Sequence, residues 1–189
     1  MRDNVINNAP SLKQQKLYNA AIYNVRLGLA YLKQGNRLRA KKKLLTALDL
    51  APNSPDVNTA MGFFLENTGD IYNARSFYKK ALALAPHNGS QLNNYGAFLC
   101  RRGYYKTAET YFLQAVTDVH YVNSAGAYEN AGLCAMAVPN YTKAIYFFKK
   151  ALQQDPGRKQ SLAKLAYAKQ KMHTTSRYYG DDHEYNSGN

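Results

Sequence analysis

Apolar residues recur every three or four positions along most of the chain, the spacing that gathers them on one face of an α-helix. The segments SQLNNYGAFLCRR (90–102) and YTKAIYFFKKALQQ (141–154) show this pattern clearly. Helical segments alternate with short turns, which fall at Gly35, Gly69, Gly103 and Pro139. The pattern predicts an all-α protein made of paired helices joined by tight turns.

Small and large residues also recur in phase from one helix pair to the next. Glycine stands at Gly28, Gly62, Gly96 and Gly132, with spacings of 34, 34 and 36 residues. Each second helix carries two alanines with a large side chain between them: Ala40-Leu44-Ala47, Ala74-Tyr78-Ala81, Ala108-Phe112-Ala115 and Ala144-Phe148-Ala151. A helical glycine costs about 1 kcal/mol relative to alanine, so its recurrence at one phase requires a steric cause. We expect the small residues to let the two helices of each pair approach closely.

A period of 34 residues with these columns resembles the tetratricopeptide repeat (TPR), whose hairpins stack into an α-solenoid. The resemblance implies four full repeats, at about 21–54, 55–88, 89–124 and 125–158, and a capping helix at 159–172. Together they form one expected superhelical domain over 11–172, whose first helix is extended backward from about Ser11. Residues 1–10 are expected to be a flexible leader, and residues 173–189 a flexible tail.

Stacked hairpins form a concave groove lined by their first helices, and the resemblance places particular residues in it. The predicted protein-binding groove consists of Ile22, Val25, Leu29, Leu32, Asp56, Thr59, Phe63, Asn93, Asn94, Ala97, Arg101, Glu129, Asn130 and Leu133. The apolar stripe of the first repeat would suit an amphipathic partner, unless residues 1–15 cover it. The amides of Asn94 and Asn130 could bond a partner's backbone or be satisfied inside the scaffold.

The two cysteines, Cys100 and Cys134, lie on successive first helices, which run nearly parallel. Their positions within the repeat differ by two, about 200° around a helix, so their side chains can face one another. A disulfide is therefore feasible if the α-carbons come within about 7 Å in an oxidising compartment. The alternative is a pair of free, small, buried residues.

The charge and the reactive residues add little to this picture. The net charge of +13 comes from 25 Lys and Arg against 12 Asp and Glu, but the cations are scattered in small clusters. We interpret them mainly as a solvated outer face, with an acidic partner as the alternative. No catalytic motif is present, no cofactor is expected, and the segment DDHE (181–184) is interpreted as tail rather than as a metal site. An enzyme is therefore the least favoured class.

Three segments resemble a narrower family than TPR proteins in general: NVRLGLAYLKQGN (24–36), NNYGAFLCRRGYYKTAETYF (93–112) and AYENAGLCA (127–135). They are similar to the type IV pilus biogenesis and stability lipoproteins known as PilF or PilW. That resemblance implies a monomeric pilotin on the periplasmic face of the outer membrane, which binds a secretin subunit and supports its assembly. The oxidising periplasm favours the Cys100–Cys134 bridge. No lipid-bearing cysteine follows an apolar leader here, so we expect this chain, which lacks the implied lipid anchor, to be a trimmed soluble form or one anchored differently.

The sequence thus predicts a non-enzymatic secretin-binding scaffold. Two alternatives remain open: a generic peptide-binding TPR adaptor or co-chaperone, and a basic nucleic-acid-binding protein. The co-chaperone class usually places several cations in the groove, whereas only Lys33 and Arg101 occupy such positions here. Nucleic-acid binding is motivated by the net charge alone, and it predicts steeply salt-dependent affinity for any duplex.

Overall fold

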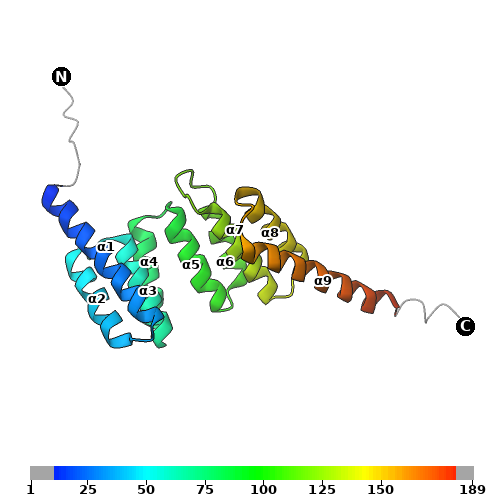
Figure 1. Ribbon diagram of the computed structural model, residues 1–189, viewed down its shortest axis with the longest axis horizontal. Helices are drawn as coiled ribbons and strands as arrows, with labels where there is room; N and C mark the ends of the chain where they lie inside the picture. Colours follow the sequence, from blue (N-terminus) through cyan, green and yellow to red (C-terminus); the bar gives the residue numbers. More distant parts are fainter. Residues whose placement is uncertain (1–10, 182–189) are drawn as a thin grey trace, which may run out of the picture. The chain divides into compact units, whose positions relative to one another are not determined.

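The computed structural model describes residues 11–181, with the side chains of residues 11–174. Over this range every regular element is a helix, which confirms the all-α prediction (Figure 1). The helices are α1 (Leu12–Lys33), α2 (Arg37–Leu50), α3 (Pro55–Thr68), α4 (Ile71–Leu84), α5 (Gly89–Arg101), α6 (Tyr105–Ala115), α7 (Ser124–Ala137), α8 (Tyr141–Gln154) and α9 (Lys159–Asp181).

The helices gather into two compact units, whereas the sequence predicted one domain over 11–172. Unit 1 ends at Ala85 and contains the hairpins α1–α2 and α3–α4. Unit 2 begins at Pro86 and contains α5–α6, α7–α8 and α9. The division falls in the loop before the third repeat, and each unit buries its own set of apolar side chains.

The in-phase glycines pack as the pattern predicted. A methyl group placed on Gly96 would lie 2.9 Å from Cε1 of Phe112 and 3.2 Å from the carbonyl oxygen of Ala108, too close for normal contact. Gly28, Gly62 and Gly132 face Leu44, Tyr78 and Phe148 in the same way. The alanines that flank these large side chains are almost completely buried. Because glycine has no side chain at this position, the two helices of each hairpin can approach closely.

Local sequence signals explain where the helices begin and end. The side chains of Asn36 and Asp70 accept hydrogen bonds from backbone N–H groups of the second helices that follow them. At the end of α3, Gly69 has φ of 93°, a left-handed conformation that glycine adopts without steric cost. Each hairpin turn is therefore determined by a glycine or polar residue at a fixed place in the repeat.

The last helix differs from the prediction in length. The cap was expected to end at residue 172, but α9 continues to Asp181. The tail was predicted from residue 173 onward because that segment is polar and contains Gly and Tyr, yet no proline interrupts residues 173–181 and the helix continues through them. The rest of the predicted tail, residues 182–189, and the predicted leader, residues 1–10, lie outside the described part of the chain.

Candidate protein-binding surfaces

The predicted groove residues of unit 1 lie on α1 and α3, which contact each other. Ile22, Leu29 and Leu32 are partly buried and share one side of α1 by their helical spacing, while Val25 between them is buried. Phe63 on α3 leaves 41% of its surface accessible although it is a large aromatic residue. We call Ile22, Leu29, Leu32 and Phe63 the unit-1 strip.

The polar edge of the unit-1 strip includes a tyrosine that the sequence analysis missed. The hydroxyl of Tyr18 donates to Oδ2 of Asp56 at 3.1 Å, which links α1 to the first turn of α3. Burial first, and then the charge of Asp56, raises the pKa of Tyr18. Thr59, one turn along α3 from Asp56, is half-buried. Since α1 is a continuous helix from Leu12, residues 12–15 extend along its axis and do not fold back over the strip.

The predicted groove residues of unit 2 are largely used by the scaffold itself. Asn130 on α7 donates from Nδ2 to Oδ1 of Asn93 on α5 at 2.9 Å, so its amide is satisfied between the first helices. Asn93 is buried, Asn94, Ala97 and Leu133 are half-buried, and Arg101 is exposed at the end of α5. The amide of Asn130 therefore bonds within the scaffold, which is one of the two roles considered for it.

Glu129 does not line an open groove, contrary to the expectation from its position. It is only 7% exposed, and its two carboxylate oxygens accept from Oγ of Ser161 at 2.6 Å and from a guanidinium nitrogen of Arg158 at 3.2 Å. Both partners precede or begin α9, which packs against α7 and α8. Glu129 thus fixes the capping helix to the last hairpin. The partners were missed because they come from a segment some 30 residues away.

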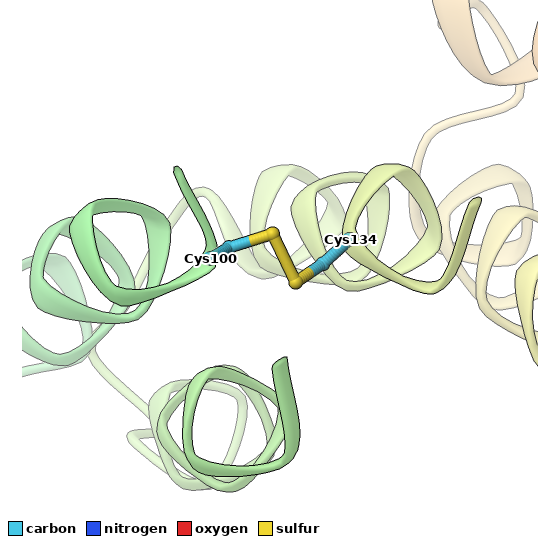
Figure 2. The surroundings of a disulfide bond; sticks show 2 residues. All are labelled: Cys100 and Cys134. Atoms are coloured by element: carbon cyan, nitrogen blue, oxygen red, sulfur yellow. A yellow bond between two sulfur atoms is a disulfide. The ribbon is translucent and has the colours of Figure 1, made fainter. Parts of the chain in front are cut away.

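The two cysteines are joined by a disulfide between the neighbouring first helices α5 and α7 (Figure 2). Their α-carbons are 5.8 Å apart, within the limit required by the sequence argument. Cys134 is buried and Cys100 half-buried. Neither sulfur is available as a nucleophile in this state. The bond adds a covalent link to the amide pair of Asn93 and Asn130, which joins the same two helices.

A hollow of about 500 Å³ opens beside the disulfide in unit 2, between the start of α6, the end of α7 and the start of α8. Its lining includes Tyr104, Val138 and Cys134, and at its margin Lys143 forms an ion pair of 2.8 Å with Glu109. The lining offers apolar contact, this ion pair and the further cation of Lys106. It contains no arrangement of nucleophile and base.

The loop between α6 and α7 contains the two extra residues of the third repeat and closes over the start of α5. Asp118 accepts from the backbone N–H of Gly89 at 2.7 Å and from that of His120 at 2.9 Å. These hydrogen bonds lower the pKa of Asp118. The ring of Tyr121 occupies the space where a side chain on residue 89 would lie, and burial raises the pKa of that tyrosine. This loop is therefore anchored within unit 2.

Charged clusters and possible metal ligands point to no further site. The side chains of Lys41, Lys42 and Lys79 are exposed on second helices, as a solvated outer face requires. Among the described residues, no group of three or more His, Cys, Asp or Glu could hold a metal ion. The segment DDHE falls outside the described side chains. Within the described range, none of the helices has both the length and the apolar character needed to span a bilayer.

The comparison with protein families identifies the repeat. Residues 25–89 and 99–159 match the tetratricopeptide repeat, and the chain therefore belongs to the TPR family. This confirms the predicted class of an α-solenoid of TPR hairpins.

Individual relatives place it more narrowly. The chain is 32% identical over 158 residues to the type IV pilus assembly protein PilF of Pseudomonas aeruginosa, which covers 82% of this chain and 63% of PilF. It is 35% identical over 131 residues to an uncharacterised protein of Haemophilus influenzae, covering 69% of this chain and 72% of that protein. The chain thus spans less than two thirds of PilF.

Solved structures agree with this placement. The structure of Pseudomonas aeruginosa PilF matches with a TM-score of 0.73 and 29% identity, over 92% of this chain and 79% of that chain. The structure of PilW, a type IV pilus biogenesis factor, matches with a TM-score of 0.72 and 22% identity, over 79% of this chain and 69% of that chain. The PilW match supports the fold alone. The predicted resemblance to PilF and PilW is confirmed.

Proposed function

We propose that the chain is a non-enzymatic TPR scaffold that acts in type IV pilus biogenesis, where it binds a secretin subunit and supports its assembly in the outer membrane. The observation that carries this proposal is the similarity to PilF, which covers 82% of the chain. TPR arrays act by presenting extended surfaces to other proteins rather than by chemistry. The absence of a nucleophile–base arrangement in the hollow of unit 2 is consistent with a binding role.

The unit-1 strip is the surface that suits a secretin segment best. It presents partly accessible apolar side chains on α1 and α3, and Phe63 is the most exposed of them. Aromatic residues in such settings often contribute a large share of binding energy, because burying them removes much apolar area from water. A secretin segment with apolar residues at helical spacing would bury Phe63 and the three aliphatic residues of α1.

A scaffold of this kind would support assembly by covering an apolar segment of the secretin subunit until the subunits associate. The proposed place of action is the periplasmic face of the outer membrane. The disulfide between Cys100 and Cys134 suits such an oxidising compartment. The predicted groove residues of unit 2 would then act mainly as a rigid support, because their polar groups already bond within the scaffold.

Co-purification of the secretin with the tagged full chain from envelope extract tests this proposal. We expect Phe63→Ala to lower the recovered secretin about tenfold, which is the usual effect of removing a central aromatic contact. Tyr72→Ala is the matched control, since Tyr72 is 83% exposed on the second helix α4 and outside the strip. Equal recovery with both variants would exclude the strip as the binding surface. Absence of secretin from the wild-type sample would contradict the proposed function.

A further inference from the structure

The capping helix α9 occupies the place of a first helix whose second helix is absent from the described residues. Ala166 follows Gly132 by 34 residues, so it stands in the glycine column of the repeat. In the four complete hairpins this column faces the large side chain of the second helix. The chain remains one continuous helix through residues 171–174, where every earlier repeat turns.

One side of α9 is packed and another is open. Ser161 and Ala168 are fully buried where α9 lies against α7 and α8. Leu162 is 50% exposed, Ala166 and Lys169 are exposed, and Leu165 is half-buried. Their spacing places these four residues on a single stripe of the helix, which we call the α9 open face. Among the described helices only α7 and α8 contact α9, so none crosses it as its own second helix.

The complete hairpins define the shape that fits such a face. Each of their second helices carries a small residue, a large one four positions later and a second small one three positions after that, as in Ala108-Phe112-Ala115. The two alanines of that set are fully buried, and the large residue contacts the glycine column. A helix with the same small–large–small spacing would cover Leu162 and Leu165 and place its large side chain over Ala166.

Charge determines which kind of helix is favoured. From Lys159 to Gly180 the sequence contains five Lys or Arg residues and no Asp or Glu. Lys169 lies within the open face, at the position where two earlier repeats have Leu65 and Leu99. An antiparallel partner places its first turn beside Lys169. Acidic residues in that turn would pair with the lysine and also stabilise the partner's own helix terminus. A second copy of α9 would instead bring two basic helices together.

We infer that the α9 open face is a second docking surface, which binds an amphipathic helix of another protein with an acidic first turn and the small–large–small spacing. This helix completes a fifth hairpin in trans. The surface is separate in sequence and chemistry from the unit-1 strip, so it provides the scaffold with a second partner or with a second segment of the same one.

A synthetic 16-residue helical peptide with Glu in its first turn and the spacing Ala-x3-Phe-x2-Ala is a direct probe, measured by fluorescence anisotropy against the full chain. We expect saturable binding that weakens at least tenfold with Ala166→Tyr, because the ring occupies the crossing point. Lys169→Glu should weaken it by about threefold to tenfold, with the difference shrinking at high salt. Ala163→Tyr and Lys171→Glu are the matched controls, since both lie outside the open face, and both should bind as the wild type does. Phe63→Ala should also bind normally.

Several outcomes would overturn the inference. If a peptide of the same composition with its alanines at other positions binds as tightly, the small–large–small spacing is not what the surface recognises. A dimer in sedimentation experiments that Ala166→Tyr dissociates would show that a second copy covers the face. Binding of phosphatidylglycerol vesicles that competes with the peptide would identify a lipid surface instead. Tighter peptide binding after truncation at Asp181 would show that residues 182–189 occupy the face in the full chain.

Discussion

Removal of the Cys100–Cys134 bond should destabilise unit 2 in particular. The bond closes a loop of 34 residues between α5 and α7. For a loop of this length the loss of chain entropy in the unfolded state corresponds to about 4 kcal/mol at 25 °C, as an upper estimate. Cys100→Ala is the suitable perturbation, because Cys100 is half-buried and its truncation leaves a smaller packing defect than truncation of the buried Cys134.

Urea unfolding followed by circular dichroism, with and without reductant, measures this effect. Reductant should lower the midpoint of the wild type to near that of Cys100→Ala, and it should leave the variant unchanged. Because repeat arrays can open region by region, hydrogen exchange adds a local measurement, with faster exchange expected in α5 and α7 than in α1 to α4. The reasoning would be refuted if two thiols react in unreduced, denatured protein purified from the periplasm. It would also be refuted if reductant leaves the unfolding midpoint of the wild type unchanged.

Three further predictions follow from the packing and the hydrogen bonds. Gly96→Ala should lower the free energy of unfolding by about 1–3 kcal/mol, measured by heat or urea, because its methyl group would lie 2.9 Å from Phe112. Ala83→Gly, on the exposed side of α4, is the control and should cost at most about 1 kcal/mol. Glu129→Ala should cost about 1–3 kcal/mol, because it leaves the buried hydroxyl of Ser161 without its acceptor and removes one of the partners of Arg158. Amide exchange should then accelerate in α9 more than in α5, and uniform acceleration would contradict this role. Hydrogen bonds hold the pKa of Asp118 below its usual 3.8, so its contribution to stability is complete above that value and is lost as pH falls through the lowered pKa. Asp118→Asn should therefore remove that part of the acid sensitivity of unfolding. An unchanged acid profile in this variant would count against the argument.

Short-range regularity made the hairpins predictable from the sequence. The columns of Gly96, Ala108 and Phe112 encode a close helix crossing, and the same three positions recur in each repeat. The cysteine pair could be anticipated for the same reason, since a separation of 34 residues places two side chains on adjoining first helices. Such features depend on period and size alone, and both can be read directly from the residues.

The partners of individual polar groups were much less predictable. Glu129 has a groove position in the repeat, but its carboxylate is held by Arg158 and Ser161, which no periodic rule connects to it. The hydrogen bond from Gly89 to Asp118 depends on the path of an irregular loop. The length of α9 was underestimated because polar residues are compatible with both a tail and a helix. Long-range contacts of this kind require three-dimensional structure.

The central claim is that this scaffold enables a secretin to assemble. The most direct measurement is the amount of heat-resistant secretin multimer in envelopes of a strain lacking the gene, compared by immunoblot with the same strain carrying the wild-type gene. The proposed function predicts that multimers and surface pili disappear in the first strain and return in the second, but not with Phe63→Ala. Normal multimers in the strain that lacks the gene would contradict it.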